Sequence, residues 1–436
     1  MLRRSLIISS LSVTAALLAG CSGGGSPTSS VPPVGPQSLA ARPSAAYVEL
    51  KAGLATGRFA HVCAAAVAGE ASCHSIIDTE TGIGKSPQGG GISPNLLSPP
   101  PAGYGPAQLQ GAYGIGALTA PAGNTVAIVD AYDDPNLEND LNVYRSAYGI
   151  PSCTTASGCF KKVNQNGVAG SYPKANGSWA QETSLDVDMV SANCPSCNII
   201  VVEANSPSFA NLGASVVTAG KFAGVKAISN SYGGNESSTE GQYSGDYTHS
   251  GIAITASSGD SGFGAQSPAS FGTVVATGGT TLTLSGNARA NETVWSGAGS
   301  GCSAYETQPS WQGAVLPVSG CAKRVISDVS YDADPNTGVA VYDSFSYRGH
   351  SGWLVFGGTS VASPAIAAIY ALAGTANGTQ YPASYTYAQY SKGVDLFDIT
   401  SGSNTTSGCS PTYLCTGGVG YDGPTGLGSP IGITAF

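Results

Sequence analysis

Five short apolar runs, rich in β-branched residues, constrain most strongly what this chain can fold into. None of them alternates polar with apolar residues, and this is the pattern of strands buried on both faces of a sheet. The runs lie at 125–129, 198–202, 225–228, 251–255 and 273–276. Helical patterns lie between or after them at 179–193, 208–222 and 361–373. This order predicts an α/β fold with a mostly parallel sheet and helices on both faces, in which active groups gather at the carboxyl ends of strands.

The composition excludes two classes of protein. With 42% hydrophobic residues the chain can build a large core, whereas disordered chains combine few apolar groups with high net charge. A formal charge of −9 argues against nucleic acid as a main partner, because its binders need clustered Lys and Arg. Only 10% of the residues are charged, so little repulsion builds up when the pH falls. This composition permits function in acidic surroundings.

The N-terminus has the features of an export signal. Two arginines precede an apolar run that ends at Leu18, followed by small residues and Cys21. The sequence Leu-Ala-Gly-Cys is similar to the bacterial lipobox, which predicts a signal peptide at 1–20 and a membrane-anchoring lipid on Cys21. The alternative is an ordinary cleaved signal peptide with an incidental cysteine. We expect an exported cell-envelope lipoprotein, and no other stretch is apolar enough to cross a bilayer.

Composition also divides the chain into segments. Residues 21–46 are rich in Gly, Ser and Pro, as in a flexible tether. Residues 47–103 form a short prosegment and a second Gly- and Pro-rich linker, and 104–436 form the main domain.

Ten cysteines remain of the 11 when Cys21 is set aside. In an exported chain, cysteines that are close in sequence are expected to form disulfides, although spacing alone does not prove the pairing. The expected pairs are 63–73, 153–159, 194–197, 302–321 and 409–415. The spacing of Cys194 and Cys197 also occurs in redox motifs and in half of a zinc site, but no matching Cys or His lies nearby.

The strongest local motif surrounds Ser360. Gly357, Gly358 and Thr359 precede this serine, and an apolar helix follows with Pro364 expected in its first turn. A hydroxyl in this position lies near the positive end of the helix dipole. A simple helix cap is the alternative for Gly-Thr-Ser alone. The longer pattern Gly-Thr-Ser-x-Ala-x-Pro resembles the nucleophile segment of the subtilisin-like serine peptidase clan.

A serine nucleophile needs a base, and histidine does not provide an obvious one. None of the four histidines opens a Gly-rich helix as the subtilisin histidine does, and the first two precede the main domain: His61, His74, His249 and His350. Ser178 and Gln181 predict a capping box at the start of a helix. On that helix Glu182 and Asp186 share a face, whereas Asp188 is turned about 200° from Asp186. Two acids on a solvated face are the alternative interpretation.

A third acid, Asp260, follows the strand at 251–255 in a Gly-bounded turn, where an Asp is often only structural. Together, Glu-x-x-x-Asp, Ser-Gly-Asp-Ser-Gly and Gly-Thr-Ser-x-Ala-x-Pro resemble the sedolisin, or serine-carboxyl peptidase, family, with kumamolisin-like motifs. The resemblance covers 104–436 and implies a subtilisin-like fold. It implies Glu182 as general base, Asp186 as its orienting partner, Ser360 as nucleophile and Asp260 in the oxyanion hole.

The resemblance implies an acid-active endopeptidase acting on extended polypeptides. A Glu base works near its own pKa of about 4.3, and Asp260 can donate a hydrogen bond only when it is protonated. Asp130 ends the strand at 125–129 and is a candidate for a relay to Glu182. A peptide substrate would add as a strand along four residues: Ser231, Tyr232, Gly233 and Gly234.

Near the C-terminus, two Gly- and Asp-rich segments resemble the family's calcium site. The implied Ca²⁺ ligands are oxygen atoms, of which this ion takes 6–8. They are the side chains of Asp398 and Asp422 and the carbonyls of Ile399, Gly418 and Gly420. Turns without metal are the alternative.

The chain departs from the family in one respect. Sedolisins usually have a long, folded N-terminal prosegment, and the segment around Cys63 and Cys73 is too short to be that domain. Either a reduced prosegment inhibits the enzyme or none is needed.

Two other functions remain open. A glycoside hydrolase also uses two carboxylates, at least ~5 Å apart, but it would not need Ser360 or Asp260. An inactive lipoprotein of the same fold could bind peptides or cell-envelope partners, and its sign would be the loss of a catalytic position, which is not seen. We expect a monomer.

Overall fold

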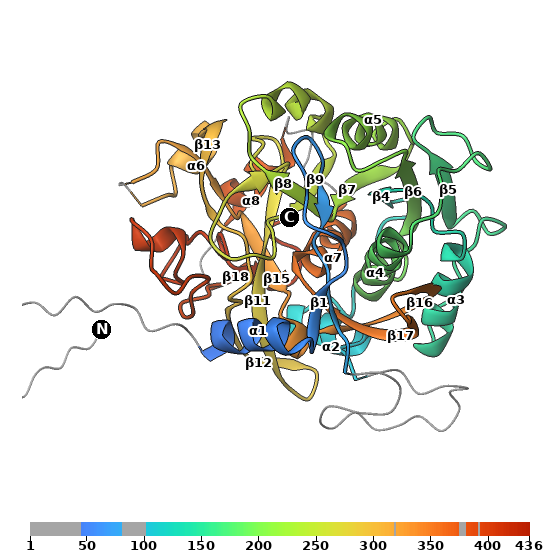
Figure 1. Cartoon of the computed structure of the whole chain (residues 1–436), viewed down its shortest axis with the longest axis horizontal. Helices are drawn as coiled ribbons and strands as arrows, with labels where there is room; N and C mark the ends of the chain where they lie inside the picture. The colour runs from blue at the N-terminus through green and yellow to red at the C-terminus, as the bar shows by residue number, and fades with distance from the viewer. Residues whose placement is uncertain (1–44, 81–101, 318–319, 375–380, 391–392) are drawn as a thin grey trace, which may run out of the picture. The chain divides into compact units, whose positions relative to one another are not determined.

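The computed structural model describes residues 45–80, 102–317, 320–374, 381–390 and 393–436, all within one compact unit (Figure 1). The predicted signal peptide, Cys21 and nearly all of the tether and linker lie outside the described residues, so they stay predictions. Among the described residues, no helix has the length and apolar character needed to cross a membrane.

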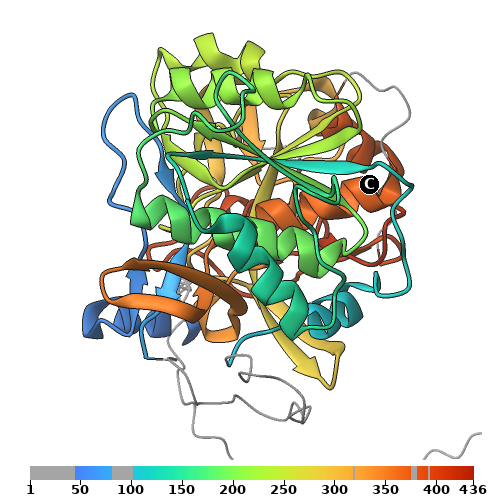
Figure 2. The same ribbon diagram turned by 90° about the vertical axis from the view of Figure 1, so that its right-hand side faces the viewer.

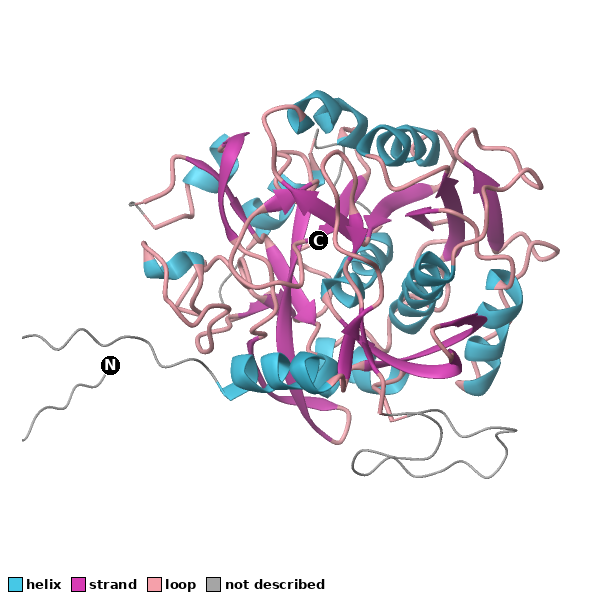
Figure 3. Ribbon diagram, in the orientation of Figure 1, coloured by secondary structure: helices cyan, strands magenta, loops and turns pink. Residues whose placement is uncertain are grey.

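The predicted parallel sheet is confirmed. Its order is β12-β11-β9-β7-β4-β6-β5, with β15 also paired to β11, and all pairs are parallel except β11 with β12. Figure 3 shows the strands in magenta and the helices in cyan. β4 is buried along its whole length, as expected for a strand covered on both faces. The strands are β4 (Thr125–Ala131), β5 (Phe160–Asn164), β6 (Asn198–Ala204), β7 (Val225–Asn230), β9 (Ala253–Ser257), β11 (Val275–Ser285), β12 (Ala288–Val294) and β15 (Val329–Asp332).

Helices cover both faces of this sheet (Figure 2). α5 and η1 lie on one face, and α4 and α7 lie on the other, with α3 packed outside α4. Small alanine side chains let the buried α7 pack closely between the sheet and α4. The helices are α1 (Ala45–Thr56), α2 (Pro106–Tyr113), α3 (Leu137–Ala147), α4 (Gly177–Asn193), α5 (Phe209–Ala219), η1 (Glu240–Tyr247), α6 (Ser310–Gly313), η2 (Pro335–Thr337), α7 (Thr359–Ala373), α8 (Pro382–Gln389) and η3 (Thr412–Leu414).

Two details of the predicted helix starts are wrong. The N-cap of α4 is Asn176, whose side-chain oxygen accepts from the backbone N–H of Ser178 at 3.1 Å. Gln181 does not complete a capping box, because its side chain donates to His350 O at 3.5 Å. Pro364 is the sixth residue of α7 and lies beyond the first turn. Its missing N–H leaves the carbonyl of Ser360 outside the helical ladder.

Smaller sheets surround the central one. β16 and β17 form a hairpin that β3 and β1 extend, and β8 lies between β2 and β10. Residues 47–80, which belong to the predicted prosegment and linker at 47–103, therefore contribute strands to two sheets of the same compact unit. The bounds are β1 (Phe59–His61), β2 (Ser72–Cys73), β3 (Ile76–Asp78), β8 (Tyr232–Asn235), β10 (Gln266–Ser267), β13 (Gly301–Thr307), β14 (Lys323–Ile326), β16 (Val339–Tyr347), β17 (His350–Gly357), β18 (Leu396–Phe397) and β19 (Ser429–Pro430).

All five predicted disulfides are present in the structure. Cys194 and Cys197 are bonded to each other, which removes the redox and zinc alternatives in the oxidised chain. Within the part of the chain that the structure describes, no group of three or more His, Cys, Asp or Glu side chains is arranged around a common metal position.

Candidate active site

Three carboxyl groups meet at the carboxyl end of β4. Asp130 is the penultimate residue of that strand, and Glu182 and Asp186 lie one turn apart on α4. All three residues have 0% exposed surface. The hydroxyl of Ser231 donates to Asp186, with Oγ 2.7 Å from Oδ1. The two acids of the α4 motif therefore lie in the protein interior and not on a solvated face.

Burial governs the protonation of this cluster. It raises the pKa of Glu182 and Asp186 well above the ordinary value, and the neighbouring Asp130 raises both further. Burial also raises the pKa of Asp130, to about 7. The hydroxyls of Ser360 and Ser75 border Glu182 and oppose the rise in its pKa. Because adjacent buried carboxylates repel one another, the cluster retains protons at acid pH and titrates as a unit.

Ser360 is the second residue of α7 and is fully buried in this structure. Its Oγ lies 3.3 Å from the carbonyl oxygen of Ser231, and its hydroxyl borders Glu182. Its backbone N–H donates to the carbonyl oxygen of His74 at 3.0 Å. The Ser360 hydroxyl thus lies beside a carboxyl group, and the Ser360 backbone N–H is bonded to a peptide carbonyl.

Asp260 follows β9 closely and is bonded to Thr359, the first residue of α7. Its Oδ1 accepts from the backbone N–H and the hydroxyl of Thr359, each at 2.7 Å, while Oδ2 has no hydrogen-bond partner among the described residues. Burial raises the pKa of Asp260 to about 7 against the opposing effect of Thr359. Below this pH the group is a neutral acid with a proton to donate.

Gly358 keeps open the space between these groups. At its φ of 99°, a β-carbon would overlap both Asp260 Oδ2 and the carbonyl oxygen of His74. The Ser360 N–H donates to the carbonyl oxygen of His74, and that oxygen and Asp260 Oδ2 both border the space beside Gly358. An oxyanion hole needs donors around the oxygen that becomes negative, and the Ser360 N–H and the Asp260 carboxyl are the candidates for that role.

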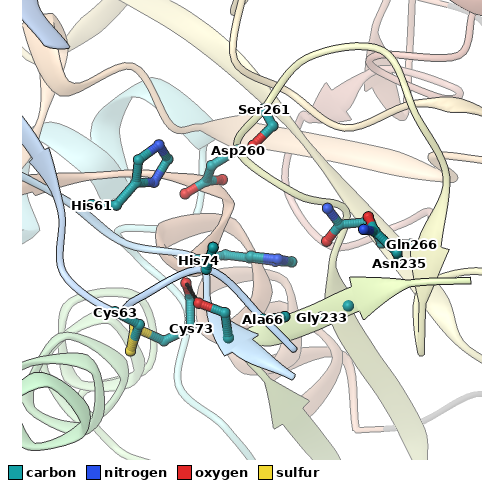
Figure 4. A pocket seen from close by; sticks show the side chains of 13 residues that line it. His61, Cys63, Ala66, Cys73, His74, Gly233, Asn235, Asp260, Ser261 and Gln266 are labelled. Carbon is teal, nitrogen blue, oxygen red and sulfur yellow. Dashed lines mark hydrogen bonds between the residues drawn. A yellow bond between two sulfur atoms is a disulfide. The ribbon is translucent and has the colours of Figure 1, made fainter. Parts of the chain in front are cut away.

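The predicted substrate edge at 231–234 lies beside this centre and is already paired on both sides, with β2 and β10. The hydroxyl of Ser231 is used by Asp186, and that of Tyr232 lies 2.7 Å from Asn230 Oδ1 in the core. Gly233 and Gly234 line a pocket (Figure 4).

The His74 side chain also lines this pocket, although this residue precedes the predicted main domain at 104–436.

The structure also brings together the residues of the expected calcium site. Gly420 N donates to Asp398 Oδ1 at 3.0 Å, and Gly418 N donates to Asp422 Oδ2 at 3.1 Å. Asp398 and Asp422 are close enough to repel, and Ile399 follows Asp398 directly. Two neighbouring carboxylates in a Gly-rich turn are hard oxygen donors, so the residues present fit Ca²⁺.

A buried serine beside carboxyl groups, on a parallel sheet covered by helices on both faces, defines a serine-carboxyl site on a subtilisin-like fold. The chain is 27% identical to sedolisin of Pseudomonas sp. (strain 101), over 75% of this chain and 60% of that protein. It is 29% identical to kumamolisin of Bacillus sp. (strain MN-32), over 76% and 63%, and 26% identical to xanthomonalisin of Xanthomonas sp. (strain T-22), over 75% and 45%. No family model matches.

A solved structure agrees with these relatives. Pseudomonas sedolisin, described as a serine-carboxyl proteinase complexed with two molecules of pseudo-iodotyrostatin, superposes with a TM-score of 0.62 at 25% identity, covering 76% of this chain and 95% of that one. The chain is therefore similar to members of the sedolisin family and has their subtilisin-like fold. It spans 45% to 63% of the length of the three curated relatives.

The buried carboxyls make stability depend on pH. Asp130, Asp134 and Asp260 have a pKa of about 7 in the fold and near 3.8 when unfolded. Their raised pKa stabilises the fold fully below about pH 4, and this contribution is lost as the pH rises toward 7. His74 has the opposite effect on stability, because burial lowers its pKa to about 4 and its contribution is lost as the pH falls. It is a single group, whereas several carboxyls have a raised pKa.

We therefore expect the full-length Ser360→Ala chain, which cannot digest itself, to melt at least roughly 5 °C higher at pH 4 than at pH 8. Differential scanning calorimetry measures both transitions. A lower melting temperature at pH 4 than at pH 8 would contradict the assigned protonation states.

Proposed function

We propose that this chain is an acid-active serine-carboxyl endopeptidase that hydrolyses peptide bonds through an acyl-enzyme on Ser360. The observation that carries the proposal is the position of Ser360 between two kinds of carboxyl group. On one side its hydroxyl is close enough to Glu182 to oppose the rise in that acid's pKa, and on the other side its N–H donates to a carbonyl oxygen that borders the same space beside Gly358 as Asp260 Oδ2.

Glu182 takes the proton of Ser360 as its Oγ attacks the peptide carbonyl carbon. With Asp130 and Asp186 protonated, Glu182 can ionise without facing another negative charge. Ser231 holds the Asp186 carboxyl in place by its hydrogen bond. The negative oxygen of the tetrahedral intermediate receives hydrogen bonds from Ser360 N–H and the neutral carboxyl of Asp260.

Collapse of the intermediate completes the first half of the reaction. The C–N bond breaks, and Glu182 passes its proton to the leaving amine, which leaves an ester on Ser360. Water then attacks this ester with the same base and the same oxyanion donors. Activity should fall in strong acid, as the cluster fills with protons, and again above about pH 7, as Asp260 ionises.

Digestion of unfolded casein by the full-length chain tests this proposal. We expect cleavage across pH 3–6, a decline above pH 7, and at least about a 10³-fold lower rate for Ser360→Ala. Gel densitometry and mass spectrometry of the fragments measure the rate. Peptide binding without cleavage by the wild-type chain would favour an inactive peptide-binding lipoprotein instead.

We further propose that Asp398, Asp422 and the carbonyls of Ile399, Gly418 and Gly420 bind Ca²⁺. The ion would neutralise two adjacent carboxylates and hold the C-terminal turn, away from the reacting atoms. Binding at a thousand times Kd stabilises a fold by about 4 kcal/mol, so we expect chelation by EGTA at pH 6 to lower the melting temperature by roughly 5 °C or more.

Calorimetry of Ser360→Ala with and without millimolar calcium measures this shift, and added Mg²⁺ should not restore it. Asp422→Asn should remove the calcium dependence. An unchanged melting temperature after chelation would refute the site.

A further inference from the structure

One segment of the chain crosses the active site in the way a substrate would. β2 pairs antiparallel with β8, with Ser72 opposite Gly233, and His74 N donates to Ser231 O at 3.1 Å. β3 pairs antiparallel with β17, with Ile77 opposite Phe356. Residues 72–78 therefore pair with the edges on both sides of Ser360, and the segment passes between β8 and β17 in Figure 1. The bond between His74 and Ser75 lies at the crossing point.

The atoms of this bond occupy the catalytic positions. The carbonyl oxygen of His74 accepts from Ser360 N–H at 3.0 Å and shares the space at Gly358 with Asp260 Oδ2. On the other side of the bond, the Ser75 hydroxyl borders Glu182. The carbonyl thus lies in the oxyanion hole, and the residue that supplies the leaving amine lies beside the base.

The His74 side chain fills a fitted pocket on the amino side of the bond. Its Nδ1 lies 2.8 Å from Ser257 Oγ, and Figure 4 shows its ring directed toward Gln266. A β-carbon on Gly233 would lie 2.6 Å from the imidazole Cε1, so the glycine makes room for the ring. The pocket thus holds a buried, uncharged imidazole that is bonded to the Ser257 hydroxyl.

The two sides of the bond are held independently of the bond itself. On the amino side, the Cys63–Cys73 disulfide fixes the residue next to His74. On the carboxyl side, β3 pairs with both β17 and β1, and Val62 N donates to Ser75 O at 3.1 Å. If the bond were cut, the new amine of Ser75 would stay beside the acyl group. Cleavage is then readily reversed.

We propose that residues 62–75 form an inhibitory loop of this chain, and that the His74–Ser75 bond is its internal substrate. This inference rests on the proposed peptidase function. Ser360 Oγ forms an ester with the carbonyl carbon of His74 as the bond to Ser75 N breaks, and the Ser360 proton passes through Glu182 to that nitrogen. The retained amine reverses the step faster than water completes it, so the intact chain cleaves other peptides, but more slowly than a chain without the loop.

Removing the clamp tests this inference. The full-length double variant Cys63→Ser/Cys73→Ser lacks the disulfide that closes this loop. Without it, the equilibrium constant for bringing the two ends of the loop together falls by about 100-fold. We expect it to digest casein at pH 4 at least about 10-fold faster than wild type and to show a new N-terminus at Ser75. Adding Ser360→Ala should abolish both changes. Cys153→Ser/Cys159→Ser, which removes a disulfide at the β5 edge of the sheet, should match wild type.

His74→Gly provides a second test that leaves every disulfide intact. This substitution empties the pocket and should also raise the rate of casein digestion. It serves as the test if circular dichroism shows that the cysteine variant does not fold. Equal rates for wild type and both loop variants would overturn the inhibitory loop while leaving the peptidase function standing. A cut at another bond would overturn the assignment of His74–Ser75. Folded variants that cleave neither casein nor themselves would overturn the peptidase function, and this inference with it.

Discussion

Replacing Glu182 by Gln should lower kcat for peptide hydrolysis at pH 4 by about 10³–10⁴-fold, the contribution of a positioned general base. Gln has the same shape but cannot accept the Ser360 proton. The side chain lies beside the nucleophile in the interior of the protein, so KM should change by less than about threefold. Steady-state kinetics on a peptide substrate separate the two parameters. The comparison applies equally to a chain slowed by the loop, because the loop is the same in both proteins.

Asp188→Asn is the matched control for this change. Asp188 is a buried acid on the same helix, and its Oδ2 accepts from the backbone N–H of Tyr342 at 3.0 Å. Burial raises its pKa well above the ordinary value, so a neutral amide replaces a neutral acid at pH 4. We expect kcat within about threefold of wild type. If Glu182→Gln kept more than a tenth of the wild-type kcat, another group would be the base.

Replacing Asp260 by Ala should lower kcat by about 10²–10³-fold, as the loss of one oxyanion-hole donor does. Asn should retain part of the activity, because its amide can donate to the same oxygen. It should also remove the decline above about pH 7, since an amide has no proton to lose there. The measurement is the pH dependence of kcat/KM for wild type and the two variants.

The two Asp260 variants distinguish a hydrogen-bond donor from a structural residue. A residue that only holds the Thr359 turn would give the same pH profile in wild type and in the Asn variant. If kcat/KM of Asp260→Asn still declined near pH 7, the decline would come from the ionisation of another group. An Ala variant with nearly full activity would exclude Asp260 from the oxyanion hole.

The central sheet and the site carboxyls could be predicted because their signals are local. An uninterrupted apolar run such as 125–129 has few structural options, and a spacing of four on a helix places Glu182 beside Asp186. The strand-ending positions of Asp130 and Asp260 follow from the topology of a parallel sheet. The disulfides could also be predicted from proximity in the sequence, because the paired cysteines are only 3 to 19 residues apart.

The part that could not be predicted depends on contacts between distant residues. His74 contacts Ser257 and Ser360, which lie more than 180 residues away in the sequence. The strand before it, Ser72–Cys73, is only two residues long and has no periodicity to detect. The one signal in the sequence was Cys73 beside His74, because a disulfide-closed loop can hold the neighbouring peptide bond in an extended conformation. The helix cap of α4 was misplaced because Ser178 resembles a cap, while Asn176 two residues earlier forms it.

The central claim is that Ser360 forms an ester with the substrate's acyl group. A peptide ester mixed with the Cys63→Ser/Cys73→Ser chain at pH 4, quenched in acid and digested, tests it by mass spectrometry. We predict a mass increase equal to the acyl group on the fragment containing Ser360, and none in the same chain carrying Ser360→Ala. Hydrolysis of the ester at an undiminished rate by the Ser360→Ala chain would contradict the account.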